Sequence, residues 1–372
     1  MGRIIFVGLD VDDQSFHGYA VCAAGELNFE FSCKPNVGSL TKKLEKISPD
    51  KSLFRICYEA TFLGFSLSRA LLKYGYQCAV IAPSLIPEVN GPRVKTDRLD
   101  SRKLAEFHRS GLLTVVSEPS EEDEQVRDLV RSRVFLNRQI LSFKKHALSI
   151  CRRAGIDYRK AVNKPTACHW TDQHRRWLET ELNKMNSGAM KSNLELMLMT
   201  FGQMEKQLET YDEEIERSAQ SGRFARKVNS LVCYRGINTL TALTFITEIG
   251  DVKRFGHPRQ LTSYCGLDLS EYSSGGLHLR RGITKMGNKH MRTAAVEVCQ
   301  KAMAHPKISS HLKRRRKDLS ALDIAIADRC MIRLYKKSRR LIEREKPRNK
   351  VKVACARELL GFVWESLNQA IV

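Results

Sequence analysis

Residues 3–11 read Arg-Ile-Ile-Phe-Val-Gly-Leu-Asp-Val, and residues 53–59 read Leu-Phe-Arg-Ile-Cys-Tyr-Glu. Both are apolar runs rich in β-forming residues, a pattern typical of a buried strand. The first run delivers Asp10, and the second delivers Glu59 at its carboxyl end. These two strands and their acids determine the fold that we predict for the N-terminal third of the chain.

Further elements surround these two strands in the sequence. Residues 16–22 and 27–33 have strand character, and residues 77–82 form another strand, which Pro83 ends. Residues 39–47 and 62–74 have the pattern of helices. Three early strands followed by alternating helix and strand predict a mixed α/β sheet covered by helices.

Two long apolar stripes follow in the middle of the chain. From Val126 to Ile150, positions spaced by three and four residues are apolar except for Arg133, and a second stripe runs unbroken from Leu194 to Ile215. The spacing predicts long helices packed as a coiled coil. A plain antiparallel hairpin and a dimerisation arm explain the stripes equally well. The polar stretch between them, residues 155–190, has no clear pattern.

A compact helical domain is expected for residues 228–306. It contains Arg-Gly-Ile-Asn-Thr at 235–239, flanked by apolar segments. This arrangement resembles half of a helix-hairpin-helix, in which a glycine turn directs backbone N–H groups at a phosphate. The chain then ends in basic helices.

The chain carries a strong positive charge, with 63 Lys and Arg against 41 Asp and Glu, a net charge of +22. Residues 313–352 hold sixteen Lys and Arg and five Asp and Glu, which gives a net charge of +11 in this segment alone. Such an excess predicts a polyanionic partner, because cations that neutralise phosphates release counterions. A solvated basic helix face explains residues 313–352 equally well.

The eleven cysteines include no Cys-x-x-Cys pair, which argues against a zinc ribbon. An odd number without a disulfide framework indicates a reducing compartment. The sequence has no signal-peptide pattern and no apolar run of membrane-spanning length. We therefore expect a cytoplasmic protein with no membrane partner.

Four acids form the first candidate site: Asp10, Glu59, Asp97 and Asp100. Open α/β sheets place their sites at the carboxyl ends of strands, where Asp10 and Glu59 stand. A helix that begins near Thr96 would put Asp97 and Asp100 on one face. Carboxylate sets of this kind suit Mg²⁺ or Mn²⁺, and two such ions can catalyse phosphodiester exchange. Alternatively, Asp97 is only a carboxylate at a helix start, where the helix dipole favours it. Asp12 could share the strand face of Asp10, so Asp10 is not the only candidate on that strand.

The second candidate site is the glycine- and serine-rich segment 264–292. Its Tyr-Ser-Ser-Gly-Gly run at 272–276 is followed by the cations Arg280, Arg281, Lys285, Lys289 and Arg292. Glycines let the backbone approach a phosphate, and the cations neutralise it. A serine here could attack phosphorus if its hydroxyl were activated. On the residues alone, a phosphate-binding loop whose serines only donate hydrogen bonds is the favoured alternative.

Taken together, these motifs make the chain resemble the DEDD transposases of bacterial insertion sequences, a family that includes the Piv-type DNA invertases. The resemblance covers both ends of the chain and rests on segments that occur in the family's order: Val-Gly-Leu-Asp (7–10), Tyr-Glu-Ala-Thr (58–61), Lys-Thr-Asp-Arg-Leu-Asp-Ser-Arg-Lys-Leu-Ala (95–105), Arg-Gly-Ile (235–237), Cys-Gly-Leu (265–267), Tyr-Ser-Ser-Gly-Gly (272–276) and Ile-Thr-Lys-Met-Gly-Asn (283–288).

The resemblance implies a division of the chain into four parts. Residues 1–122 would form a RuvC-like, RNase H-type α/β domain, and residues 123–222 a helical coiled-coil region for dimerisation. Residues 223–310 would form a mainly α-helical transposase domain with the serine motif, and residues 311–372 the basic C-terminal helices.

The resemblance also implies a chemistry. Asp10, Glu59, Asp97 and Asp100 would bind Mg²⁺, and Ser274, rather than its neighbour Ser273, would be the nucleophile. Strand cleavage would leave a covalent phosphoserine link, and exchange would pass through a Holliday-junction-like intermediate. The partners would be the DNA of the element ends and target and a non-coding bridge RNA. The active form would be a dimer or tetramer with composite sites, associated with the bacterial nucleoid.

One departure and two rival functions accompany this interpretation. Many relatives carry proline and arginine where this chain has Asp268-Leu269-Ser270-Glu271, beside the serine motif. A RuvC-like Holliday-junction resolvase, acting by hydrolysis, would need the four acids but not Ser274. A non-catalytic nucleic-acid-binding relative would need neither, and the intact set of acids argues against it.

Overall fold

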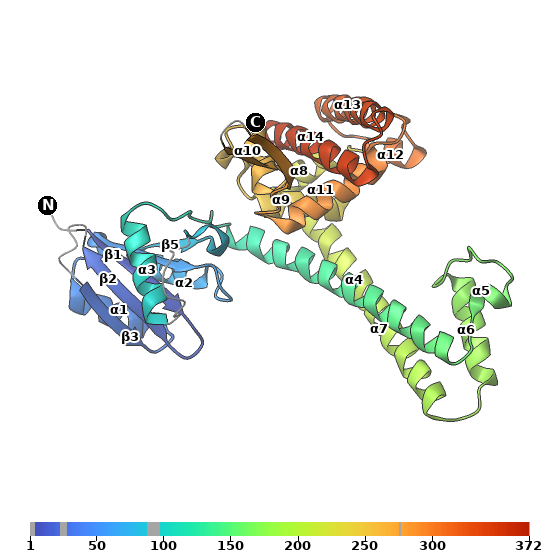
Figure 1. The fold of residues 1–372 in the computed structure, drawn as a ribbon, viewed down its shortest axis with the longest axis horizontal. Helices are drawn as coiled ribbons and strands as arrows, with labels where there is room; N and C mark the ends of the chain where they lie inside the picture. The colour runs from blue at the N-terminus through green and yellow to red at the C-terminus, as the bar shows by residue number, and fades with distance from the viewer. Residues whose placement is uncertain (1–3, 23–27, 88–96, 275–276, 372) are drawn as a thin grey trace. The chain divides into compact units, whose positions relative to one another are not determined.

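The computed structural model describes residues 4–22, 28–87, 97–274 and 277–371 of the 372-residue chain. The chain divides into two compact units, Met1–Glu118 and Pro119–Val372. In Figure 1 the colour runs along the chain from blue at the N-terminus to red at the C-terminus. The first unit is built on a sheet, whereas the second is mostly helical.

The N-terminal unit contains the mixed α/β sheet that the sequence predicts. Its strands lie in the order β3 (Asn28–Cys33), β2 (Phe16–Cys22), β1 (Ile5–Val11), β4 (Phe54–Glu59) and β5 (Gln77–Ile81). The pairs β1–β2 and β2–β3 are antiparallel, whereas β1–β4 and β4–β5 are parallel. This arrangement is consistent with the RuvC-like fold that the resemblance implies.

Helices cover both faces of this sheet. Alternate residues of β1, such as Val7 and Leu9, are buried in one core with Leu40 and Leu71, from α1 (Val37–Ile47) and α2 (Ser66–Lys73). The helix α2 is shorter than the predicted 62–74. On the other face, α3 (Asp97–Arg109) packs across β1 and β2, as Figure 1 shows. The 3-10 turns of this unit lie at Lys51–Leu53 and Pro83–Leu85.

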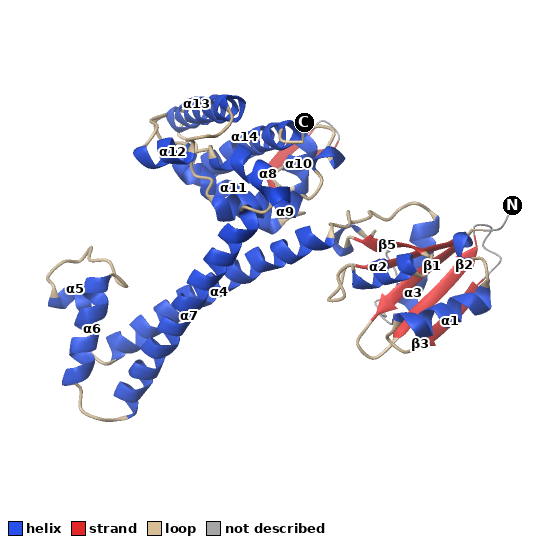
Figure 2. Ribbon diagram, turned by 180° about the vertical axis from the view of Figure 1, so that it is seen from behind, coloured by secondary structure: helices blue, strands red, loops and turns tan. Residues whose placement is uncertain are grey.

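The two predicted apolar stripes meet each other within the second unit. They belong to α4 (Glu121–Arg153) and α7 (Ala189–Ala219), which pack side by side in Figure 2. Ile150 near the end of α4 shares a cluster with Leu194 near the start of α7, so the helices are antiparallel. Arg133, the one polar residue in the first stripe, donates two hydrogen bonds, of 2.8 and 3.0 Å, to Asp212 of α7.

The connection between α4 and α7 contains two helices that the sequence pattern did not reveal. They are α5 (Tyr158–Ala161) and α6 (Asp172–Lys184). Their shared interior is aromatic, with His174 stacked edge-on against Tyr158 at 4.7 Å between ring centroids. The backbone N–H of Trp170 donates to Nδ1 of His174 over 3.1 Å, which holds Trp170 at a left-handed φ of 65°.

The remaining helices and a β-hairpin complete the second unit. The helices are α8 (Gly222–Val232), α9 (Thr239–Ile249), α10 (Pro258–Tyr264), α11 (Lys289–Ala302), α12 (Ser310–Arg315), α13 (Ala321–Glu343) and α14 (Arg348–Gln369), with a 3-10 turn at Val252–Arg254. One hydrophobic core joins residues of α4, α7 to α11, α13 and α14. In the part of the chain that the structure describes, no helix is both long and apolar enough to cross a membrane.

The buried histidine of α6 generates a prediction about pH. His174 is 2% exposed, and burial, with smaller contributions from His169 and Arg175, lowers its pKa to about 4. Protonation would also break the hydrogen bond from Trp170 to Nδ1. The unfolded chain takes up this proton near pH 6.5 and the folded chain only near pH 4. The stability of the α5–α6 region should therefore fall by up to about 3 kcal/mol between these values.

Hydrogen exchange of the α6 amides, corrected for intrinsic pH dependence, measures this loss. His174→Phe, which cannot titrate, should remove most of the pH dependence and leave only the smaller part due to His169, whose pKa burial also lowers. His146→Gln, a change at an exposed histidine of α4, should retain it. Equal pH dependence in His174→Phe and the unsubstituted protein would contradict the prediction.

Candidate functional site

The first candidate site depends on a close contact between α3 and β1. A Cβ atom added at Gly8 of β1 would lie 2.2 Å from the Ser101 carbonyl oxygen and 2.4 Å from the Ala105 amide nitrogen. Both atoms belong to the backbone of α3, so they cannot move aside as a flexible side chain can. Only glycine lets the helix lie this close to the strand.

Three contacts show that α3 runs antiparallel to β1. His108, near the end of α3, stacks edge-on against Phe6, near the start of β1, at 5.4 Å between ring centroids. The middle of the helix covers Gly8. At the other end, Asp97 faces His17, which pairs with Asp10 across β1 and β2. The first turn of α3 therefore lies over the carboxyl end of β1.

The strand register puts Asp10 and Glu59 on this same face of the sheet. Leu9 pairs with Tyr58 in the parallel ladder of β1 and β4, so the next residues, Asp10 and Glu59, come side by side. Because side chains alternate along a strand, Asp10 shares the face of Gly8, which contacts α3. Glu59 likewise shares the face of Cys57, whose thiol donates to the Leu104 carbonyl of α3.

The helix α3 supplies the other two acids from its first turn, as the sequence predicts. Asp97 and Asp100 both stand in that turn, where the positive end of the helix dipole favours carboxylates. The Asp97 side chain is 68% exposed, and its Oδ2 lies 3.8 Å from Nε2 of His17. The side chains of Asp10, Glu59 and Asp100 are half-buried.

The structure thus brings all four predicted acids to one face of one unit, but it does not close them into a site. Within residues 4–22, 28–87 and 97–274 and the rest of the described chain, no three His, Cys, Asp or Glu side chains converge to hold a metal ion. His17 was not predicted as a site residue, although its pairing with Asp10 across β1 and β2 places it on this face.

The predicted nucleophile lies in a β-hairpin rather than a loop. Strands β6 (Leu269–Ser274) and β7 (Leu277–Ile283) pair antiparallel, with Ser274 opposite Leu277 and Ser273 opposite His278. The Gly-Gly pair that follows Ser274 is a common hairpin signal, and it could have revealed this element. The side chains of residues 272–281, and with them Ser274, Arg280 and Arg281, lie outside the described part of the structure.

The segments on either side of this hairpin, residues 264–268 and 284–288, form its base, and each contains a glycine that packs against the backbone of the other segment. Gly266 and Gly287 both have left-handed φ angles, of 62° and 108°. A Cβ at Gly266 would meet the Met286 carbonyl oxygen at 2.2 Å, and one at Gly287 would meet the Tyr264 carbonyl oxygen at 2.3 Å. The two segments therefore pack backbone against backbone, and only glycine satisfies both the conformation and the contact.

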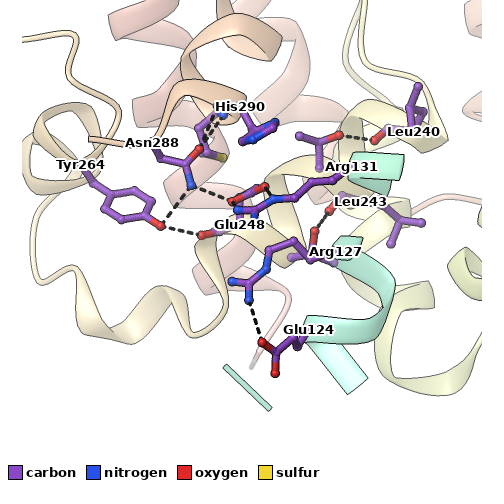
Figure 3. A network of polar contacts seen from close by, with 12 residues as sticks. Glu124, Arg127, Arg131, Leu240, Leu243, Glu248, Tyr264, Asn288 and His290 are labelled. Carbon is purple, nitrogen blue, oxygen red and sulfur yellow. Dashed lines mark hydrogen bonds and ion pairs between the residues drawn. The ribbon is translucent and has the colours of Figure 1, made fainter. Parts of the chain in front are cut away.

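Asn288 joins this base to a buried carboxylate in the centre of the unit (Figure 3). Its Oδ1 accepts from the backbone of His290 and Met291 and so caps α11. Its Nδ2 donates to Glu248 of α9 over 2.7 Å. Arg131 of α4 donates to both oxygens of the same carboxylate, each over 2.8 Å. One network thus ties α4, α9 and α11 to the hairpin base.

The charge state of Glu248 follows from this network. Burial alone raises the pKa of its carboxyl group, but the hydrogen bonds and charge of Arg131, with Asn288, outweigh burial and hold the pKa below its usual value. Glu248 therefore remains ionised in the interior of the unit. No local sequence pattern reveals this pair, because its partners are 117 residues apart.

The predicted basic contacts divide into two kinds. Lys285 and Lys289 are exposed beside the hairpin base. Arg292 is half-buried, and its guanidinium donates to the Cys265 carbonyl over 2.8 Å, so it helps to hold the base. Burial raises the pKa of the Cys265 thiol to about 12, so this cysteine remains protonated and unreactive at neutral pH.

Part of the basic segment 313–352 is also structural. Arg316 is buried and donates to the Cys233 carbonyl, and Arg315 donates to the carbonyls of Tyr234 and Ile237. These bonds fix the glycine turn between α8 and α9. Others in the segment are exposed, among them Lys313, Arg314, Lys317, Arg339, Arg340 and Lys346.

Comparison with known proteins identifies relatives along most of the chain. Residues 7–153, which include the four acids, match a DEDD transposase family of the IS110 type, and residues 229–313, which include Ser274, match the transposase IS116/IS110/IS902 family. The chain is 32% identical to a Sinorhizobium fredii protein named "Putative transposase y4qE", over 99% of this chain and 90% of that protein. It is 29% identical to the transposase for insertion sequence element IS1533 of Leptospira borgpetersenii, over 93% and 99% of the two chains.

The contact at Gly8 generates a prediction about stability. Gly8→Ala should displace α3 and destabilise the N-terminal unit by about 2 kcal/mol, because backbone atoms block the added carbon. Urea denaturation and hydrogen exchange of the α3 amides measure the change. Gly38→Ala, in α1 of the same unit, is the matched control, since its added carbon meets only the Asn36 side chain, at 3.7 Å. A Gly8→Ala protein as stable as Gly38→Ala would contradict the prediction.

The hydrogen-bond network at Glu248 generates a second prediction about stability. Glu248→Gln keeps the shape but removes the charge that balances Arg131, and we expect a loss of about 3 kcal/mol at neutral pH. Because the pKa of Glu248 is lowered on folding, its contribution is complete above pH 4.5 and declines as the pH falls below this value. Urea denaturation measures the free energy of unfolding of Glu248→Gln and of the unsubstituted protein. The difference between these two free energies should become smaller as the pH falls below 4.5.

An exposed carboxylate provides the control for this experiment. Glu214→Gln, which alters a helix-surface pair with Arg217, should cost less than about 1 kcal/mol. If Glu248→Gln cost no more than Glu214→Gln, the ion pair would not hold the hairpin base.

Proposed function

This chain belongs to the DEDD transposases of the IS110 type, and we propose that it cleaves and rejoins DNA through the four acids and Ser274, under the guidance of a non-coding RNA. That the enzyme is a DNA transposase follows from its family. The observation that carries the site proposal is that the first turn of α3, with Asp97 and Asp100, lies over the strand ends that carry Asp10 and Glu59.

The four carboxylates fit a divalent metal ion in donor type. Their oxygens are the hard ligands that Mg²⁺ or Mn²⁺ prefers, and Asp10 and Glu59 stand together at the ends of adjacent strands. Half-buried carboxylates on one face repel one another, and a cation relieves this repulsion. When bound, such ions supply charge stabilisation to the attacking and leaving oxygens of phosphodiester exchange.

Ser274 is the proposed nucleophile. Its hydroxyl oxygen would form a bond to phosphorus, the bond from phosphorus to the leaving strand oxygen would break, and that oxygen would receive the proton. Joining is the reverse reaction with another strand end, so no phosphodiester bond is lost. Support comes from the Tyr-Ser-Ser-Gly-Gly motif and from the clamped base that fixes the hairpin.

RNA guidance and a multimeric active form belong to the same proposal. The exposed cations of residues 313–352 offer phosphate contacts in addition to the cations of the serine segment, and an RNA could occupy them. The acids and the serine stand in different compact units. We infer a dimer or tetramer in which the acids of one protomer act with the serine of another.

A covalent-adduct assay tests this proposal. The full chain is incubated with Mg²⁺, the element's end and target DNA and the transcript of its flank, then denatured, and DNA that stays attached to protein is measured. We expect an adduct from the unsubstituted protein and from Ser273→Ala, the matched control, but none from Ser274→Ala. Asp97→Asn should lower the yield by on the order of 100-fold or more without weakening DNA binding.

The alternative chemistry has a distinct outcome. Metal-dependent strand breaks that survive Ser274→Ala, with no adduct from any protein, would replace the proposal with a hydrolytic resolvase. An adduct that forms equally well without the transcript would overturn RNA guidance alone.

A further inference from the structure

A pocket between α10 and α14 has no assigned role in the proposed chemistry. We propose that it receives one unstacked nucleotide from a single strand of the bound nucleic acid. The inference rests on the proposed function in one respect: it assumes that single strands lie near the serine hairpin during exchange. The pocket itself belongs entirely to the second unit, and its volume is about 630 Å³.

The size of the pocket depends on a missing side chain. Gly361 lies within α14 and lines the pocket opposite Pro258 of α10. A Cβ added at Gly361 would meet only the Pro258 side chain, at 4.0 Å. Glycine within a helix costs up to about 1 kcal/mol relative to alanine. Neither a left-handed φ nor a backbone contact requires glycine at position 361. The effect of this glycine is therefore to leave open space in the pocket.

Aromatic and apolar groups line the pocket. The indole N–H of Trp364 donates to the Phe255 carbonyl over 2.8 Å, which holds the ring in place. Phe362 and Pro258 add further apolar surface. Rigid aromatic surfaces bind unstacked bases, because every base has a flat face that can stack on them. Ligand sites of this chemistry have volumes of roughly 300 to 1,000 Å³.

The charged side chains that line the pocket balance in number but leave one cation, Arg259, for a phosphate. The acids of the pocket are already engaged, since Glu358 accepts from Lys337 over 2.5 Å and Asp268 lies 3.7 Å from Arg357. Glu365 pairs with Arg329. The lining holds three cations, Arg259, Lys337 and Arg357, against these three acids. Lys337 and Arg357 face acids, whereas Arg259 is exposed and forms no ion pair within the described part of the chain, so it is the cation that a phosphate would meet here.

The position of Asp268 connects the pocket to the serine hairpin. Its side chain lines the pocket, and its backbone carbonyl accepts from the Thr284 N–H at the hairpin base. Strand β6 begins at the next residue and ends at Ser274. A nucleotide held in the pocket would therefore fix a strand beside the base of the element that carries the nucleophile. The cation Arg357, 3.7 Å away, balances the charge of Asp268 at this position.

A pocket-filling substitution tests the inference. Gly361→Leu places a side chain in the open space and favours the helix, so the protein should remain folded. Gly202→Leu is the matched control, because Gly202 lies in α7 of the same unit and an added carbon there meets nothing within 4 Å. Circular dichroism and thermal melting check that both proteins fold like the parent.

The probe is a short single-stranded DNA that carries 2-aminopurine, titrated into the full chain in the presence of EDTA. Stacking in the pocket should quench the base fluorescence. Gly361→Leu should lose the quenching and bind about tenfold more weakly, whereas Gly202→Leu should match the parent. An abasic version of the strand should bind the parent and Gly361→Leu equally.

Repeating the titration with an RNA version of the probe shows which nucleic acid supplies the nucleotide. A loss of quenching and affinity in Gly361→Leu with either probe supports the inference. Equal affinity and quenching in the parent and Gly361→Leu, with both probes, would overturn it. Neither metal nor strand transfer takes part in this experiment. Its failure would therefore leave the proposed chemistry intact, and failure of the adduct assay would leave the pocket untouched.

Discussion

Backbone-to-backbone contact at glycine is the constraint on which both candidate sites depend. At Gly8 the helix α3 lies directly on β1, which puts the first turn of the helix, with Asp97 and Asp100, over the strand ends that carry Asp10 and Glu59. At Gly266 and Gly287 the two segments that flank the serine hairpin meet in the same way. A carboxylate or hydroxyl can be aimed reproducibly only if the element that carries it is fixed, and contacts between backbones leave less freedom than contacts between long side chains.

The arginines of this chain serve two purposes that a charge count does not separate. Arg131, Arg133, Arg315 and Arg316 bind carboxylates or carbonyls inside the second unit. A guanidinium suits this task because its planar fork can satisfy several acceptors while it remains charged. The surface available to phosphates is therefore smaller than the net charge of +22 suggests. Among the described residues it includes the exposed cations of the C-terminal helices, the two lysines beside the hairpin and exposed cations of the segment that precedes the serine motif.

The sequence predicted the features that arise from local periodicity. The strands with Asp10 and Glu59, the helix start beside Asp97, and the stripes of α4 and α7 all follow from spacing within a few residues. Features that depend on distant partners escaped prediction. Arg133 looked like a break in an apolar stripe because Asp212 is 79 residues away. No structural role was predicted for Asn288, because its partner Glu248 lies in another helix. The α5–α6 region, whose interior is built from histidine, tyrosine and tryptophan, has no simple apolar period.

The junction between the units bears on how the two sets of residues would act together. The compact N-terminal unit ends at Glu118 and α4 begins at Glu121. The first turns of α4 already belong to the serine-bearing unit, since Asp123 accepts from Arg223 of α8 over 2.6 Å and Arg131 binds Glu248. Very few residues therefore separate the sheet with the four acids from a helix that is fixed to the hairpin base. In the proposed dimer or tetramer, the acids of one protomer would act with the serine of another protomer, and no covalent linker joins those two sets of residues.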